Sequence, residues 1–385
     1  MKNPLLLILA LWGAGLGGAA QYAKFSVIFD LLPAAYPQAG PALGWIVSLV
    51  GLVGIVFGVA AGVLVARIRY RRALLAALWL GAGISAAQAL MPGFGLMLAL
   101  RGLEGLSHLG IVVAAPTLIA QLAPAAWRGF ALTLWGTFFG VAFAVLAWLG
   151  RPLALDHGIP ALFAAHAVYM AAFALLLGAG LRALPQEATP AFSLPQVLRD
   201  HAAIYRSPFL LAPAAGWLFY TFCFVSILTV LPPWLAPEAR GPVMAAMPLA
   251  SIAVSMTLGV VLLRVISAVG VVMLGFGLSA LCMPLLWIWP AAPVLCLLLA
   301  GAMGLIQGAS FAAVPQLNTT PAAQARANGA MAQMGNLGNT LGTPVMAAAL
   351  AGLGYAALPI LAGAAFLAGL LAHIALGKAR RSTAS

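Results

Sequence analysis

Residues 95–123 read GLMLALRGLEGLSHLGIVVAAPTLIAQLA, and within this stretch only Arg101 and Glu104 carry a formal charge. A helix needs about 20 consecutive, mostly apolar residues to cross the hydrocarbon core of a bilayer. The stretch exceeds that length, and it is far longer than the roughly ten-residue alternating segments of a membrane β-barrel. It therefore predicts a transmembrane helix.

The composition of the whole chain is as apolar as this stretch suggests. Of 385 residues, 64% are hydrophobic and 6% are charged, and the mean hydropathy is +1.09. About a quarter of the residues of a soluble globular protein are charged, so this chain cannot cover a surface that faces water. Because backbone N–H and C=O groups in lipid need internal partners, we predict an all-α integral membrane protein.

Apolar segments of spanning length recur along the chain, separated by charged residues or by proline and glycine. The twelve predicted spans are residues 5–32, 42–66, 73–93, 95–123, 127–150, 159–183, 209–236, 242–264, 267–290, 291–316, 327–353 and 355–377. The first apolar run extends to about Leu32, beyond the roughly 7–15 apolar residues of a cleaved signal peptide. We therefore interpret it as the first helix.

The basic residues predict the orientation. With the N-terminus inside, fourteen of the 18 lie in cytoplasmic segments, two in outer loops and two, Lys24 and Arg101, within spans. The outer pair is Arg151 and Arg240, and the cytoplasmic set is Lys2, Arg67, Arg69, Arg71, Arg72, Arg128, Arg182, Arg199, Arg206, Arg264, Arg326, Lys378, Arg380 and Arg381. An excess of Lys and Arg marks the cytoplasmic side. Topology thus accounts for the net charge of +12, so no nucleic-acid partner is expected, and both termini are predicted to be cytoplasmic.

The stretch from Pro185 to Pro208 is the one extended polar segment of the sequence. Its charged residues are interleaved with leucine, valine and isoleucine, which predicts a cytoplasmic linker, residues 185–208, containing a short amphipathic interfacial helix. The linker divides the chain into two six-helix halves, residues 1–184 and 209–385.

The two halves also resemble each other. One shift of 199 residues aligns Phe25 with Phe224, Pro33 with Pro232, Gly105 with Gly304, Pro116 with Pro315 and Gly136 with Gly335. Parallel internal repeats of this kind are typical of secondary transporters, whose substrate sites lie near the membrane midplane.

Over essentially its whole length the sequence resembles the major facilitator superfamily. The run from Gly62 to Arg72, GVLVARIRYRR, is similar to the family's G-x-x-x-D-R-x-G-R-R loop, with Ala66 at the acidic position and Arg69 at the inner glycine. The resemblance implies a gating loop carried by Gly62, Arg67 and Arg71. A positive-inside loop explains these arginines equally well.

The fourth predicted helix carries a second similarity. Its run RGLEGLSH, residues 101–108, resembles the family's R-x-x-Q/E-G pattern, which is associated with proton coupling. From Arg101 through Pro116 to Trp135 the chain looks most like the cyanate-permease-like branch. The family implies two pseudo-symmetric halves, alternating access and a monomer. The Gly-Pro pair of many drug/proton antiporters is missing from the fifth helix, where neither Gly136 nor Gly140 is followed by proline.

Charge within the spans indicates function independently of the family. A charged side chain at the bilayer centre costs about 2.5–3.5 kcal/mol on insertion scales, so it is normally partnered or functional. Lys24 and Glu104 are expected at the same depth, given the fixed rise of a helix. The same reasoning predicts a pair between Asp30 and Arg101. The alternative for both pairs is a static brace.

Proton coupling is predicted for a set of four residues, Glu104, Arg101, Asp30 and His108. If Lys24 leaves Glu104, or receives an anion from the substrate, the carboxylate takes a proton more readily. His108 lies one helical turn from Glu104, where it either relays a proton or hydrogen-bonds a helix carbonyl.

The predicted substrate-binding side chains come from both halves. They are Lys24, Gln21 and Tyr22 in the first, and Trp217, Tyr220, Thr221, Gln307, Gln333 and Asn336 in the second. Aromatic residues in spans also pack against lipid, and amides also join helices to one another, so both structural roles stay open.

Taken together, these patterns predict a secondary transporter for proton-coupled uptake of a small organic anion in a bacterial inner membrane. The alternative is proton-driven efflux of drugs or metabolites. The sequence has no H-E-x-x-H motif and no nucleophile-and-base constellation, and its three cysteines lack metal-like spacing. An enzyme, a metal and a cofactor are therefore not expected, and gradient-coupled, saturable flux would distinguish the carrier from a channel.

Overall fold

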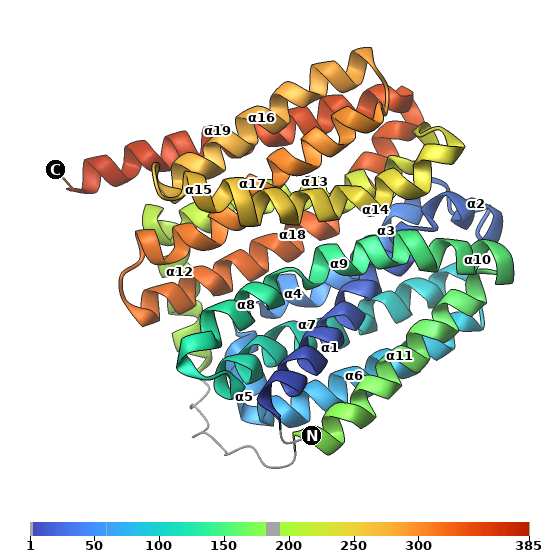
Figure 1. Ribbon diagram of the computed structural model, residues 1–385, viewed down its shortest axis with the longest axis horizontal. Coiled ribbons are helices and arrows are strands. Elements are labelled where there is room, and N and C mark those ends of the chain that lie inside the picture. The colour runs from blue at the N-terminus through green and yellow to red at the C-terminus, as the bar shows by residue number, and fades with distance from the viewer. Residues whose placement is uncertain (1–2, 59, 182–192, 385) are drawn as a thin grey trace. The chain divides into compact units, whose positions relative to one another are not determined.

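The computed structural model describes residues 3–58, 60–181 and 193–384 (Figure 1). Within these ranges all regular structure is helical, which confirms the predicted all-α fold. Eleven segments there are long and apolar enough to cross a membrane. The last of them, Ala322–Ser382, covers 61 residues and includes two helices separated by a turn, so the count agrees with twelve spans.

The chain forms two compact units, residues 1–38 with 60–192 and residues 39–59 with 193–385. The first contains α1 Pro4–Ser26, α2 Leu32–Ala35, α5 Ala61–Ile68, α6 Tyr70–Ala89, α7 Phe94–Leu122, α8 Arg128–Gly136, α9 Phe138–Val145, α10 Arg151–His157 and α11 Ile159–Gly180. The second contains α3 Leu43–Ser48, α4 Leu52–Phe57, α12 Leu194–Arg206, α13 Pro208–Val230, α14 Pro237–Val254, α15 Val260–Leu262, α16 Ala268–Ile288, α17 Pro293–Leu317, α18 Pro321–Leu353 and α19 Ala357–Ala384.

These units do not follow the predicted halves at every point. Residues 39–59, assigned from the sequence to the first half, group with the second unit. They do so because α3 and α4 pack along α18, where the Ser48 hydroxyl donates to the Asn339 carbonyl at 2.9 Å. Lys2, Arg182 and the first part of the predicted linker, residues 185–192, lie outside the described residues. The division at the linker stays a prediction.

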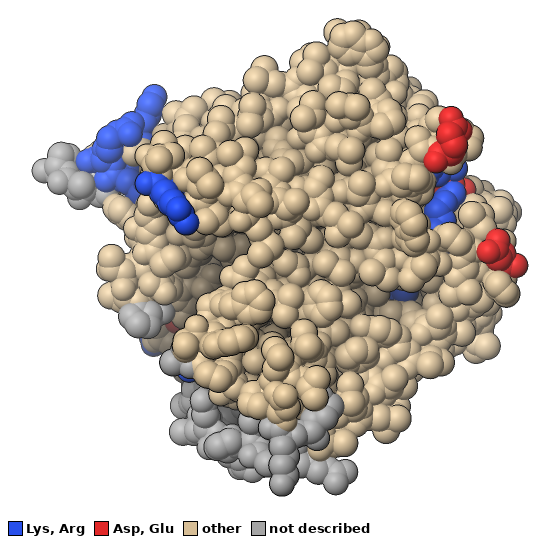
Figure 2. Space-filling model, viewed as in Figure 1, with Lys and Arg blue, Asp and Glu red and all other residues tan. Residues whose placement is uncertain are grey.

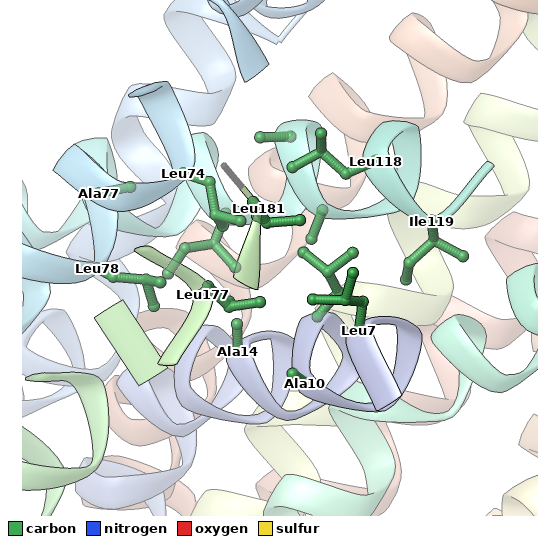
Figure 3. Packing of buried hydrophobic residues seen from close by; sticks show 14 of the residues in the cluster. Leu7, Ala10, Ala14, Leu74, Ala77, Leu78, Leu118, Ile119, Leu177 and Leu181 are labelled. Atoms are coloured by element: carbon green, nitrogen blue, oxygen red, sulfur yellow. The ribbon is translucent and has the colours of Figure 1, made fainter. Parts of the chain in front are cut away.

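The core of the first unit lies between α1, α6, α7 and α11. Figure 3 shows Leu7, Ala10 and Ala14 of α1 facing side chains of the other three helices, among them Leu74 and Leu177. In lipid there is little hydrophobic drive between helices, so close packing of small and branched side chains holds them together. This packing fixes the positions of the polar residues that the same helices carry further along.

In the second unit, α18 approaches α13 closely. Gly338 lies against the backbone of Leu218 and Phe222, and Gly342 lies against the Phe222 backbone. A row of small residues allows two helix backbones to come this near.

The polar stretch before α13 contains α12. Ser193 caps this helix by accepting a hydrogen bond from the Gln196 N–H, as expected for an N-cap serine. Ile204 is buried, and the Tyr205 hydroxyl donates to Gln333 Oε1 of α18 at 2.8 Å. Burial raises the pKa of the Tyr205 phenol, so the hydroxyl keeps its proton for this hydrogen bond.

The loop between α5 and α6 consists of Arg69 alone, whose φ of 75° is a conformation that favours glycine. A side chain in such a region costs on the order of 1–3 kcal/mol. We expect Arg69→Gly to raise the stability of the protein by about 1 kcal/mol net, because glycine relieves the strain but is more flexible when unfolded. Thermal unfolding of the two purified proteins checks this, and an unchanged or lower midpoint contradicts it.

Candidate functional site

Lys24 of α1 is fully buried and makes three short hydrogen bonds. Its Nζ donates to Ser85 Oγ at 2.8 Å and to Gln88 Oε1 at 2.6 Å, both on α6, and to Glu104 Oε1 of α7 at 2.6 Å. An ammonium group has three protons, so these acceptors use all of them. Lys24 and Glu104 thus form the ion pair predicted from their depths.

Glu104 is equally well bound. Its Oε2 accepts from Gln88 Nε2 at 2.9 Å and from Nη1 of Arg101, three residues earlier on α7. Lys24, Arg101 and Glu104 each have 0% exposed side chains. Two buried cations therefore share one carboxylate, and loss of its charge would destabilise the network.

His166 of α11 completes the network. Its Nε2 lies 2.9 Å from the Gly17 carbonyl oxygen, which can only accept, so Nε2 carries the proton. Nδ1 then accepts from the Ser85 hydroxyl at 2.7 Å. His166 is thus held as a neutral imidazole that orients Ser85 toward Lys24.

Two aromatic rings cover the cations. The Arg101 guanidinium lies 4.4 Å from the ring centroid of Phe25, and Lys24 Nζ lies 5.6 Å from that of Phe163. Both arrangements are within cation–π range. The rings also exclude water, which strengthens the electrostatic interactions inside.

Asp30 lies beyond the end of α1, in a short 3₁₀ turn. Both of its oxygens accept from Arg151 of α10, at 2.6 and 2.8 Å, and Arg151 also donates to the Val27 carbonyl at 2.7 Å. Arg151, expected in an outer loop, instead begins a helix and ties it to the end of α1. The predicted Asp30–Arg101 pair and the role of Asp30 in proton coupling stay predictions.

Three polar side chains lie next to the network on α1 and α7. His108 Nδ1 is 3.0 Å from the Gly18 carbonyl, and its ring meets that of Tyr22 edge to face with centroids 5.2 Å apart. Gln21 Nε2 donates to Ser107 at 2.7 Å. Among the described residues, Gln21 Oε1 and the Tyr22 hydroxyl are buried without a hydrogen-bond partner, which is unusual in a folded protein.

The predicted substrate-binding side chains of the second unit make contacts of several kinds. The Trp217 and Tyr220 rings stack at 4.7 Å, and the Thr221 hydroxyl donates to the Trp217 carbonyl at 2.9 Å. Gln307 Oε1 lies 3.4 Å from Ser251 Oγ, and Asn336 donates to Ala332 of its own helix at 2.8 Å.

Gln333 is a structural bridge within the second unit. Its Oε1 accepts from Tyr205, and its Nε2 donates to the Ile55 carbonyl of α4 at 2.8 Å. A role for Gln333 and the other second-unit candidates in substrate binding stays a prediction.

The predicted gating loop forms part of the α5–α6 connection. Gly62 and Arg67 lie on α5, and Arg71 in the first turn of α6 donates to the Gly178 carbonyl of α11 at 2.9 Å. Arg71 therefore joins two helices of the first unit, and gating by this loop stays a prediction.

Ser85, Gln88 and His166 were not predicted as site residues from the sequence. Ser85 and Gln88 are spaced i, i+3 on an otherwise apolar helix and so share one face, which was the available signal. His166 had no comparable signal, because only the fold brings it to Lys24. Across the described ranges, no group of three or more His, Cys, Asp or Glu residues could hold a metal ion.

The sequence model of the Major Facilitator Superfamily matches residues 6–343. The chain belongs to this superfamily. Among solved structures it is similar to the crystal structure of the human organic anion transporter MFSD10 (TETRAN), with 18% identity, a TM-score of 0.66, and coverage of 97% of this chain and 100% of that one. At that identity the likeness shows the fold. No curated protein sequence matches the chain.

This membership confirms the family resemblance found in the sequence. The chain is a multi-pass membrane transporter of small molecules and not an enzyme. The resemblance to the cyanate-permease-like branch stays a prediction.

Proposed function

We propose that the protein couples proton movement to the uptake of a small organic anion through the network of Lys24, Arg101 and Glu104. The observation that carries the proposal is that two fully buried cations share a single carboxylate. A static brace between two helices needs one cation for one carboxylate. In the proposal, Lys24 and Arg101 together hold the substrate anion next to Glu104.

The charges couple the two ligands. A proton on Glu104 removes the negative charge that Lys24 and Arg101 share, and leaves two cations close together in a low-dielectric interior. An anion that binds to them restores the balance. Proton and anion therefore favour each other's binding, and such coupling is reciprocal. Joint binding and release across the membrane is symport.

Gln21 and Tyr22 provide the neutral contacts in this proposal. The Tyr22 hydroxyl can donate to an anionic substrate oxygen, and Gln21 Oε1 can accept from a substrate hydroxyl or amide. Satisfying a buried polar atom gives specificity as well as affinity. MFSD10, which is similar in fold, is an organic anion transporter, and this supports the same substrate class.

A ligand screen followed by a transport assay tests the proposal. Thermal unfolding of the purified protein is measured with small carboxylate anions and with lipophilic cations, at two pH values. Uptake of any stabilising anion into proteoliposomes is then measured with and without a proton gradient. We expect anions to stabilise more at the lower pH and to accumulate when the outside is acidic.

The decisive variant is Lys24→Ala, which removes one of the two cations that contact Glu104. We expect the affinity for the anion to fall about tenfold or more, as for the loss of one charge-assisted hydrogen bond. Lys378→Ala, at an exposed lysine of α19, is the matched control and keeps wild-type uptake. If lipophilic cations stabilise the protein instead, and Lys24→Ala leaves that effect intact, the protein is an efflux transporter.

A further inference from the structure

The second unit contains a groove of about 430 Å³ where three helix ends meet. The first turn of α16 contributes Ser267 and Gly270, the end of α17 contributes Gln316, and the last turns of α19 contribute Gly377, Arg380 and Arg381. None of these residues belongs to the network around Lys24.

The charges around the groove favour an anion. Two arginines line it from α19, and the N-terminus of the 21-residue helix α16 opens into it. Ser267 Oγ accepts a hydrogen bond from the Gly270 N–H at 3.1 Å, and Gln316 Oε1 accepts one from the Ala268 N–H at 2.8 Å. The positive end of the helix dipole remains directed at the groove and adds to the field of the arginines.

A buried histidine on the groove wall points independently to a missing ligand. His373 of α19 is 1% exposed, and neither of its ring nitrogens has a hydrogen-bond partner among the described residues. Buried imidazoles are normally hydrogen-bonded, and an anionic oxygen can accept from an imidazole N–H. His373 Nε2 packs against Gly216 of α13, which leaves Nδ1 as the nitrogen that can donate to an anionic oxygen in the groove.

The internal repeat explains why the groove exists. In the first unit, Arg71 spans from α6 to the Gly178 carbonyl of α11. The shift of 199 residues takes Arg71 to Gly270 and Gly178 to Gly377, and both glycines line the groove. The second unit therefore lacks the arginine that closes this position in the first, and the space it would fill is left open.

The surroundings of the groove indicate where the anion comes from. Ile266 beside Gly270 is 42% exposed, and Ile374 on the groove wall is 36% exposed. Figure 2 shows Lys and Arg gathered at the C-terminal end of α19, next to a surface without charged side chains. A ligand with an anionic head and apolar chains matches both the basic residues and the apolar surface, whereas a free phosphate matches only the basic residues.

We propose that this groove binds the phosphodiester headgroup of an anionic phospholipid, with Arg380, Arg381 and His373 around the phosphate and the acyl chains along Ile266 and Ile374. Arginine guanidinium groups bind phosphate oxygens through paired hydrogen bonds. The site lies outside the proposed transport network and does not depend on the proposed function.

Thermal unfolding of the full chain in a mild neutral detergent tests this site. Phosphatidylglycerol, phosphatidylcholine or inorganic phosphate is titrated in, and the midpoint is followed. We expect phosphatidylglycerol to raise the midpoint, and the other two to have little effect. In the double variant Arg380→Gln/Arg381→Gln the apparent affinity for phosphatidylglycerol falls about tenfold or more. Lys378→Gln, on the same helix but outside the groove, keeps the wild-type response.

A second variant guards against loss of folding, since Arg380 also donates to the Pro208 carbonyl. Gly270→Met fills the groove without adding charge, and the atoms nearest to a Cβ at Gly270 are Ser267 Oγ at 3.2 Å and Ile266 Cδ1 at 3.8 Å. It is expected to fold and to lose the response to phosphatidylglycerol. A full response in this variant, or equal stabilisation of the wild type by phosphatidylcholine or by inorganic phosphate, overturns the proposal.

Discussion

Replacing Glu104 by Gln is expected to abolish proton-driven accumulation of the anion while leaving exchange of the anion across the membrane intact. The amide imitates the protonated carboxyl group, so the variant stays in the form that binds the anion. Lys24 and Arg101 then no longer share the charge of Glu104, and anion binding becomes independent of pH. Two transport modes measured in proteoliposomes separate these effects: uptake driven by an inward proton gradient, and counterflow of labelled against unlabelled substrate.

The same substitution carries a large cost in stability. Removing one partner of a buried charge network typically costs about 3–5 kcal/mol, because the remaining charges stay buried without compensation. We therefore expect Glu104→Gln to unfold at a lower temperature than the wild type, and the bound anion to restore much of the loss. A brace without a transport role predicts the loss without the rescue.

Glu238→Gln is the matched control for Glu104→Gln. Glu238 is an exposed carboxylate in the first turn of α14, so its neutralisation is expected to change neither coupling nor stability appreciably. If Glu104→Gln still accumulates the anion against its gradient when protons flow inward, another group carries the proton and the proposed coupling is wrong.

The sequence predicted the part of the network that depends on depth alone. Lys24 and Glu104 were paired because the rise of a helix fixes how deep each residue lies, and they do form an ion pair. Depth does not fix the direction of a side chain around its helix. That is why Ser85 and His166 were missed, although both lie within hydrogen-bonding distance of Lys24.

The residue at which a helix ends was harder to predict from the sequence, and the position of Asp30 depends on it. The apolar run continues to Leu32, but α1 ends at Ser26, and a 3₁₀ turn then sets the direction of Asp30. Composition indicates only the apolar run, and it does not indicate where the α-helix changes to a 3₁₀ turn. Arg151 was assigned to a loop for the same kind of reason, since charge marks the end of a span more often than the start of a further helical turn.

The glycines of the eleventh predicted span indicate a close helix contact, but the sequence did not predict which helix they contact. Gly335, Gly338 and Gly342 recur at helical spacing, and the structure places all three against α13. A repeat of small residues indicates a helix contact, but it does not name the partner helix. The partner emerges only when the chain is folded.

Gly342→Leu is expected to be among the most destabilising single substitutions in the protein. A Cβ at this position would collide with the backbone carbonyl of Phe222, and backbone cannot turn aside as a flexible side chain can. α13 and α18, the most extensively packed pair of helices in the described part of the second unit, would have to separate. Overpacking usually costs about 1–3 kcal/mol, and we expect a value at or above the top of that range here.

Gly352→Leu, on the same helix, provides the comparison that isolates this effect. A Cβ at Gly352 meets nothing within 4 Å, so the substitution adds the same side chain without a collision. Because leucine favours a helix by about 1 kcal/mol over glycine, the control is expected to be as stable as the wild type or slightly more so. Size-exclusion profiles and thermal unfolding in detergent compare the two variants. Equal midpoints would show that α18 does not rest on α13 at Gly342, and that the close approach of these helices is not what holds the second unit together.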